Sequence, residues 1–318
     1  MKFYKYTLFL VGLGLAIIST AFLLSSKEVS DKDIRDSYHS VAAQPASGET
    51  GITISVPVPE AVEFCGEKIS LLRFDMHERF DREINTFTYL HATTLLYMKR
   101  ANRFFPVIEP ILKANGIPDD FKYLSVIESN LDIRAISPAK AAGLWQFMEA
   151  TGKSFGLEIS PEVDERYHVE KATEAACQYL NSAYNKYGNW VNVAASYNAG
   201  MGRISSEMNN QLVDSAFDLL LVSETSRYVF RIMAIKQIFE NLDKYGFKLK
   251  KNALYPLIPT QYISVDRTID DLAAFAKEKN LNYMILKEFN PWLRDTKLSV
   301  RTGKSYQIAV PKREDLFY

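Results

Sequence analysis

The sequence predicts a mainly α protein that ends in a small β-α-α-β unit. Between about residues 70 and 245, apolar residues recur at helical spacing, and Gly/Pro turns divide the run into separate helices. After Lys250 the pattern changes to short segments typical of strands, with helices between them. The 318 residues, 47% of them hydrophobic, are enough for about two domains with buried cores.

The N-terminal segment has the pattern of an export signal. Lys2 and Lys5 precede an apolar stretch over residues 6–24. The length of this stretch lies at the border between a cleaved signal and a membrane span. We therefore expect residues 1–26 to be a signal peptide or membrane anchor. The remainder would be exported to the periplasm, anchored to the membrane if the segment stays uncleaved.

A linker and the helical domain follow. Residues 27–69 are rich in Ser, Asp, Ala, Gly and Pro, which predicts a tether with little structure of its own. Residues 70–250 are predicted to form the helical domain together with an N-terminal helical extension. Pro106 and Pro110 interrupt the helical pattern near its start.

The C-terminal unit is expected over residues 255–318. Residues 262–265 and 306–310 are predicted to be strands. A helix is predicted over residues 268–279, with Thr268 as its N-cap, and a second short helix around Leu286.

Charge and cysteine usage exclude several classes of function. Lys+Arg and Asp+Glu are equal at 38 each, so no basic field favours nucleic acid as a partner. The four histidines are scattered, and Cys65 and Cys177 form no CxxC pair. We therefore expect no metal and no cofactor. The sequence leaves open whether the two cysteines form a disulfide.

Glu128 is the first candidate for catalysis. Phe121, Leu124 and Glu128 fall at i, i+3 and i+7 of a predicted helix, which places the carboxylate on the apolar stripe. Desolvation there would raise its pKa, as a general acid needs. From this segment alone, a carboxylate paired with a basic group or lying at the helix edge is the favoured alternative.

Three further segments bear on that choice. In residues 141–148 a small-residue turn leads into Trp145 and Gln146, and residues 196–200 place Tyr197 and Asn198 before a glycine. A later helix carries Glu224 and Tyr228 on one face, one turn apart. Each also has a structural interpretation: Trp145 as core, Gln146 as surface, Asn198 as a helix C-cap.

Together, in this order and spacing, these segments resemble the soluble-lytic-transglycosylase family. The motifs that carry the resemblance are Glu128-Ser129, Gly143-Leu144-Trp145-Gln146, Tyr197-Asn198-Ala199-Gly200 and the pair Glu224/Tyr228. The similarity extends from about Arg79 to Phe239.

The resemblance implies a lysozyme-like helical domain that acts on peptidoglycan glycan strands. It implies non-hydrolytic cleavage of the β-1,4 MurNAc-GlcNAc bond to a 1,6-anhydro end, with Glu128 as the catalytic acid and base. Ser129 would orient the substrate or bond to Glu128. Gln146, Tyr197 and Asn198 would hold the N-acetyl groups, Tyr228 would lie near the carboxylate, and Glu224 would support it.

The C-terminal unit resembles a LysM carbohydrate-binding module. The matching features are the first strand, the Thr268-Ile269 helix start, Asn290 and the closing segment 303–311. Asp266-Arg267 stand where Gly-Asp is usual. Glycan binding and a packing or spacer role both remain open for this unit.

Two alternatives to a lytic transglycosylase remain. One is a hydrolytic muramidase of the same fold, which would need a second acid. Asp132 and Glu149 are the nearest acids downstream of Glu128, and neither falls in a motif. The other is a non-catalytic peptidoglycan-binding scaffold, which gives no reason for a glutamate on an apolar stripe.

Overall fold

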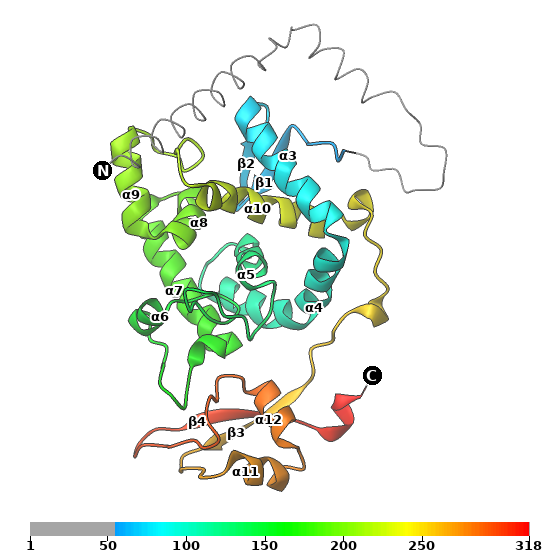
Figure 1. The fold of residues 1–318 in the computed structure, drawn as a ribbon, viewed down its shortest axis with the longest axis vertical. Coiled ribbons are helices and arrows are strands. Elements are labelled where there is room, and N and C mark those ends of the chain that lie inside the picture. The colour runs from blue at the N-terminus through cyan, green and yellow to red at the C-terminus, as the bar shows by residue number, and fades with distance from the viewer. Residues whose placement is uncertain (1–54, 318) are drawn as a thin grey trace, which may run out of the picture. The chain divides into compact units, whose positions relative to one another are not determined.

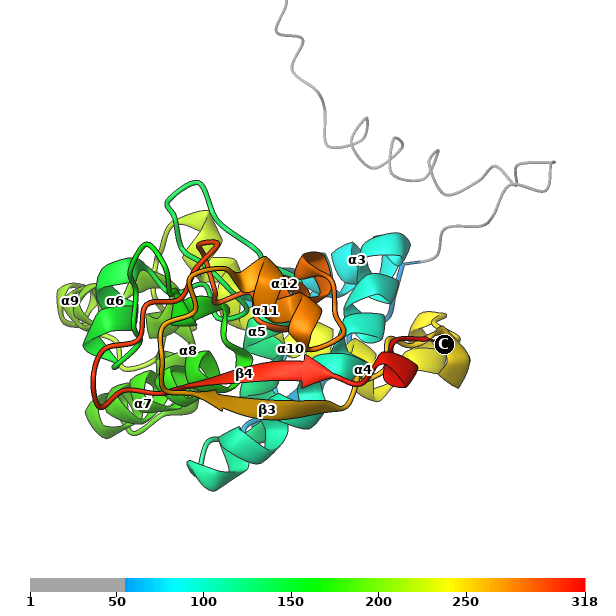
Figure 2. The ribbon, with the colours of Figure 1, turned by 90° about the horizontal axis from the view of Figure 1, so that it is seen from below.

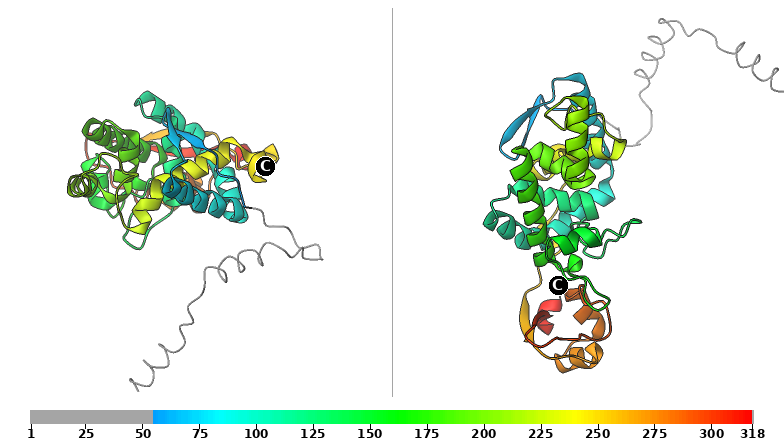
Figure 3. Two further views of the ribbon diagram at one scale, coloured as in Figure 1. Left: turned by 90° about the horizontal axis from the view of Figure 1, so that it is seen from above. Right: turned by 90° about the vertical axis from the view of Figure 1, so that its left-hand side faces the viewer.

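The computed structural model describes residues 55–317, which begin with a β-hairpin (Figure 1). Its antiparallel strands are β1 (Ala61–Phe64) and β2 (Glu67–Ser70). Cys65 and Gly66 join them with φ angles of 53° and 83°. Positive φ at both positions suits a two-residue hairpin turn. Val62 and Phe64 point inward and are buried, and the hairpin lies beside helix α10 (Ser223–Glu240; Figure 3).

The predicted linker over residues 27–69 is therefore wrong for residues 61–69. The alternation of Val62 and Phe64 gives this short segment a buried face, which is enough to fix it against the helices. Residues 1–26, the predicted signal or anchor, and the first part of the predicted linker lie outside the described residues.

Helices make up the body that follows. They are α3 (Phe74–Tyr89), α4 (His91–Ala114), α5 (Lys122–Ser129), α6 (Glu149–Ser154), α7 (Val169–Tyr187), α8 (Trp190–Ala199), α9 (Met201–Gln211) and α10. Pro106 and Pro110 lie inside α4 and do not end it. The buried stripe that includes Phe105, Ile108 and Leu112 continues past both prolines, so packing offsets their lost hydrogen bonds.

The core lies around α10 and the short helix α5. Helix α10 packs against α3, α5 and α8, and Phe230 and Ile235 on it are fully buried. Helix α5 lies between α4 and α10, with Leu124 and Val126 fully buried (Figure 1). Burial on several sides explains how an eight-residue helix is held in place.

The C-terminal unit has the predicted β-α-α-β order. Its elements are β3 (Thr260–Val265), α11 (Leu272–Glu278), α12 (Tyr283–Phe289) and β4 (Tyr306–Pro311). The strands pair antiparallel, and both helices lie on one face of this sheet (Figure 2). Helix α11 begins later than predicted. Asp271, not Thr268, is its N-cap, because its carboxylate accepts the amides of Ala273 and Ala274.

The mainly α fold with a small C-terminal unit is thus confirmed. Cys65 and Cys177 are both free thiols, so they do not form a disulfide. From Ser55 to Phe317, none of the helices has the length and apolarity that crossing a bilayer would take.

Candidate active site

Glu128 lies near the C-terminal end of α5. The chain enters this helix through a 3-10 turn over Asp119–Phe121, whose acidic residues complement the positive helix end. The helix ends where Asn130 takes a left-handed φ of 57°. Phe121 and Leu124 are fully buried, and the Glu128 side chain is half-buried on the same stripe. The predicted placement of the carboxylate on the apolar face is confirmed.

The environment of Glu128 raises its pKa to about 7. Burial is the largest cause, because desolvation disfavours the charged form. The hydroxyl of Tyr228 donates a hydrogen bond to Oε1 of Glu128, which lowers the pKa, and the positive charge of Arg231 lowers it further. The negative charge of Glu224 raises it. Near neutral pH the carboxyl is therefore divided between its protonated and ionised forms.

Two tyrosines accompany the carboxyl, Tyr228 buried and Tyr197 partly buried. Burial raises the pKa of Tyr228 and Tyr197 well above the usual value, and the charge of Glu128 adds to both shifts. Both remain neutral hydroxyl donors. The hydroxyl of Tyr197 donates to the carbonyl of Trp145 at 2.8 Å, which joins α8 to the turn 143–147.

The turn 143–147 has a constrained backbone. Gly143 has a φ of 78°, and a Cβ at this position would lie 1.8 Å from the carbonyl oxygen of Arg166. Gln146 has a φ of 49°, and its side-chain amide donates to the carbonyls of Ala135 and Gly143 at 3.2 and 2.8 Å. Gln146 is thus fixed by its own loop and is not a free surface residue.

Asn198 joins the end of α8 to the start of α10. Its Oδ1 accepts a hydrogen bond from the hydroxyl of the buried Thr225 at 2.8 Å. The helix C-cap is Gly200, with a φ of 83°, so the alternative of Asn198 as the C-cap is wrong. The side chain of Asn198 links two elements that carry candidate site residues.

Ser129 and Glu224 occupy less direct positions. The buried hydroxyl of Ser129 donates to the carbonyl of Ser125 at 2.9 Å, so it bonds to its own helix and not to Glu128. Glu224 is exposed in the first turn of α10, one turn before Tyr228. Its contribution is the negative charge that acts on Glu128.

The two other acids considered from the sequence are engaged elsewhere. Asp132 forms an ion pair with Arg100 at 3.4 Å, and its carboxylate accepts the amide of Arg134 at 3.0 Å. Glu149 is exposed and pairs with Lys153 at 2.6 Å.

Arg231 and Thr225 were not predicted from the sequence. Arg231 follows Tyr228 by three residues, which places it on the same face of α10, and its charge acts on both Tyr228 and Glu128. Its guanidinium lies 6.0 Å from the ring of Phe87. The helical spacing from Tyr228 is the signal that could have identified Arg231.

Two domain families match this chain. Residues 106–216 match the transglycosylase SLT domain, and residues 261–314 match the soluble lytic transglycosylase C-terminal LysM-like domain. The first match contains the segments that carry Glu128, Gln146, Tyr197 and Asn198.

Curated relatives include a murein transglycosylase. The chain is 29% identical over 245 residues to the membrane-bound lytic murein transglycosylase D of Escherichia coli (strain K12), covering 75% of this chain and 52% of that protein. It is 30% identical over 123 residues to a putative tributyltin chloride resistance protein of Alteromonas sp. (strain M-1), covering 38% and 59%. The chain thus spans about half the length of the first of these relatives.

Solved structures with partial similarity include two lytic transglycosylases. The 70 kDa soluble lytic transglycosylase SLT70 of Escherichia coli aligns with a TM-score of 0.39 and 21% identity, over 55% of this chain and 32% of that one. An inactive mutant of lytic transglycosylase Slt from Pseudomonas aeruginosa aligns with a TM-score of 0.35 and 19% identity, over 48% and 26%. From the domain and sequence matches, the chain contains a transglycosylase SLT domain followed by a LysM-like domain and is homologous to membrane-bound lytic murein transglycosylase D.

Proposed function

We propose that this protein is a peptidoglycan lytic transglycosylase, and that Glu128 is its catalytic acid and base. The observation that carries the proposal is the half-buried Glu128 of an SLT domain, with a pKa of about 7 and a hydrogen bond from Tyr228. The substrate is the β-1,4 bond between MurNAc and GlcNAc in glycan strands.

The reaction needs one group that first gives and then takes a proton. Protonated Glu128 donates to the glycosidic oxygen while the bond from that oxygen to C1 of MurNAc breaks. The C6 hydroxyl oxygen of the same MurNAc then bonds to C1, and its proton returns to Glu128. The products are a 1,6-anhydro-MurNAc end and a GlcNAc hydroxyl, and no water is consumed. A pKa near the working pH suits both steps, because neither protonation state is strongly disfavoured.

The surrounding groups have supporting roles in this proposal. Tyr228 holds the carboxyl, and its neutral hydroxyl limits how far the pKa rises. Gln146, Tyr197 and Asn198 line the substrate site on segments that their own hydrogen bonds fix in place. Ser129 supports α5 through its bond to Ser125.

Location and binding follow the same proposal. An SLT domain and a LysM-like domain favour peptidoglycan as the binding partner. The homology to a membrane-bound murein transglycosylase favours a periplasmic site of action. Anchoring would be through residues 1–26, which lie outside the described residues.

The test compares muropeptides released from purified sacculi by the wild type and by Glu128→Gln. We expect anhydro-muropeptides in the mass spectrum of the wild type and a loss of about 10²–10⁴-fold in the variant. Glu149→Gln is the matched control, because it makes the same change at an exposed carboxylate paired with Lys153. Reducing MurNAc ends in place of anhydro ends would assign a hydrolytic muramidase instead, and the exposed Glu224 would then be its candidate second acid. Equal release by wild type and Glu128→Gln would rule out catalysis by this residue, and no release by either protein would leave only a binding scaffold.

A further inference from the structure

The C-terminal unit and the helical body share part of one hydrophobic core. The buried cluster that holds Leu293, Trp292 and Ile308 of the C-terminal unit also includes Ala142 and Val163 of the helical body. Ala142 immediately precedes the turn 143–147. The core of the LysM-like unit thus reaches the segment that carries Gln146.

Backbone hydrogen bonds between residues 162–164 and 292–294 also connect the two units, and we call this contact the joint. Val163 and Leu293 form an antiparallel bridge. The amide of Asp164 donates to the carbonyl of Trp292 at 2.9 Å, and the amide of Arg294 donates to the carbonyl of Glu162 at 2.8 Å. Residues 162–164 are therefore paired with residues 292–294 much as in a short strand ladder.

The buried ion pair between Asp164 and Arg166 connects this joint to the turn 143–147. Arg166 donates to both carboxylate oxygens of Asp164, at 2.9 and 2.7 Å, and both side chains are about nine-tenths buried. A second amino group of Arg166 donates to the carbonyls of Lys140 and Phe147 at 2.9 and 3.1 Å. The backbone of Arg166 fills the space that a side chain at Gly143 would need. Arg166 thus holds both ends of the loop that contains the turn.

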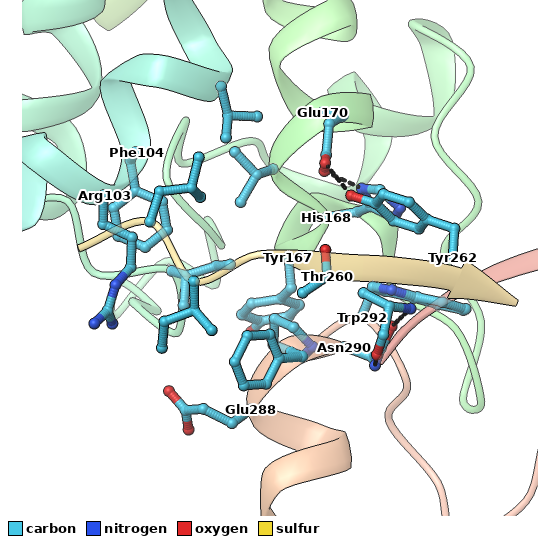
Figure 4. Close-up of a pocket in the computed structure, with 18 of the residues that line it drawn as sticks. Arg103, Phe104, Tyr167, His168, Glu170, Thr260, Tyr262, Glu288, Asn290 and Trp292 are labelled. Carbon is cyan, nitrogen blue, oxygen red and sulfur yellow. Dashed lines mark hydrogen bonds and ion pairs between the residues drawn. The ribbon is translucent and has the colours of Figure 1, made fainter. Parts of the chain in front are cut away.

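Side chains secure the joint on a second side. Figure 4 shows Tyr262 of β3 beside Glu170 of α7, where the tyrosine hydroxyl donates to the carboxylate at 2.7 Å. His168 stacks on Trp292 with ring centroids 5.8 Å apart, and Trp292 stacks in turn on Tyr306. These contacts border a mostly apolar cavity of about 430 Å³.

We propose that the C-terminal unit is a structural part of the substrate site, and that Arg166 is a positioning residue that holds the turn 143–147 through Asp164 and the joint. The proposal rests on the proposed function for its catalytic consequence. A buried arginine that loses part of its hydrogen bonding is costly, so Arg166 moves when its pairing with Asp164 is lost. Its bonds to Lys140 and Phe147 then break, and the turn that carries Gln146 becomes mobile. The active-site residue Tyr197 bonds to Trp145 of the same turn and loses its fixed partner as well.

The first test measures backbone amide exchange in the full chain. Arg166→Lys keeps the charge but loses the fork geometry, and Asp164→Asn keeps the shape but loses the charge. We expect at least tenfold faster exchange in both variants at the amides of Ala142 and Gly143, which are hydrogen-bonded in the loop, and unchanged exchange in α10. Unchanged exchange at Ala142 and Gly143 in both variants would overturn the proposal, whatever the activity.

Arg134→Lys is the matched control. Arg134 also joins the two units, through an ion pair with Glu288 at 2.8 Å, but this pair is half exposed, and the Arg134 guanidinium bonds to Lys287 and Glu288 of α12. Exchange at Ala142 and Gly143 should be the same in this variant as in the wild type. Faster exchange at these amides in Arg134→Lys would mean that the loss of any contact between the units loosens the turn. The positioning role could then not be assigned to Arg166.

The second test measures turnover of a short soluble peptidoglycan fragment. Arg166→Lys and Leu293→Ala should each lower kcat at least tenfold at a temperature well below the unfolding midpoint of each variant. If the unit served only to bind glycan, Leu293→Ala would raise KM for long strands and leave kcat on the short fragment unchanged, which would overturn the proposal. A wild type with no turnover would refute the proposed function alone, because the exchange result stands without it.

Discussion

At the scale of single residues, the raised pKa of Glu128 suits acid and base catalysis near neutral pH but lowers the stability of the fold when the carboxyl is ionised. Its pKa of about 7 in the fold lies above the ordinary value of 4.5. The folded state therefore holds the proton more tightly than the unfolded chain. This favourable contribution is complete below pH 4.5 and is lost as the pH rises through about 7. The loss amounts to about 3 kcal/mol of unfolding free energy.

Glu128→Gln should therefore stabilise the protein in a pH-dependent manner. The amide carries no charge to bury, so we expect a gain of up to about 3 kcal/mol in unfolding free energy at pH 8 and almost none at pH 4. Denaturant unfolding of both proteins at the two pH values measures this difference. An equal gain at both pH values would mean that the ionisation of Glu128 is not its source.

Tyr228→Phe should shift the pH dependence of activity. The Tyr228 hydroxyl stabilises the ionised form of Glu128, so its removal raises the pKa of the carboxyl further. We expect the alkaline limb of kcat to move to higher pH and the maximal rate to fall by about tenfold, because the carboxyl is no longer oriented. Tyr187→Phe is the control, since that hydroxyl bonds to Met201 and Ser205. A limb that stays in place in Tyr228→Phe contradicts the assignment.

The sequence predicted part of this residue-scale arrangement. Helical spacing placed Glu128 on the apolar stripe, where burial raises its pKa, but spacing alone favoured a paired or helix-edge carboxylate, and the accompanying motifs were needed to reverse that order. It could not predict that the Ser129 hydroxyl turns back to Ser125, because this choice depends on the packing around α5. Arg231 belongs to no motif, and its proximity to Glu128 depends on how α10 packs against α5.

At the scale of elements, the turn 143–147 depends on glycine at its first position. Gly143→Ala introduces a Cβ 1.8 Å from the Arg166 carbonyl at a φ of 78°, so either the turn or the Arg166 backbone must move. We expect a loss of about 2–4 kcal/mol in stability, measured by thermal or denaturant unfolding. Gly202→Ala, in helix α9 with open space around it, should be neutral or slightly stabilising. Comparable losses in both variants would show that the close contact at Gly143 is not responsible.

The elements also show where sequence patterns lose information. The helices were readable because their apolar stripes repeat over several turns. The hairpin over residues 61–70 has four residues in each strand, and its alternation is limited to the exposed Glu63 between the inward Val62 and Phe64. An alternation this short does not distinguish a strand from a linker when it follows a Pro-rich segment. Thr268 and Asp271 are both residue types that can cap a helix. Which of them does so depends on the path of the loop before α11, which the local sequence does not determine.

At the scale of the whole molecule, a shared core predicts shared unfolding. Because Ala142 and Val163 lie in one buried cluster with Leu293, the C-terminal unit cannot unfold without exposing part of the helical body. We expect calorimetry of the full chain to give one cooperative transition for the two units. Leu293→Ala should move this whole transition to lower temperature, by an amount that corresponds to about 2–5 kcal/mol. A separate early transition in the variant would indicate two independent units.

The joint between the units was outside the reach of the sequence. The helical domain and the C-terminal unit were each predicted from the sequence. Nothing in the segment 158–167, however, indicates that its backbone pairs with residues 292–294. The contacts join residues more than 120 positions apart, and no local pattern encodes such a pairing.

The same joint limits how this protein can be recombined. The ladder between residues 162–164 and 292–294 requires a matched surface on each side, reinforced by Glu158 with Lys304 and by Glu162 with Ser299. A chimera that exchanges only the chain after about residue 255 would bring a foreign face against residues 158–167. We therefore expect a functional graft of the C-terminal unit to carry the segment 158–167 with it, although the two pieces are far apart in the sequence.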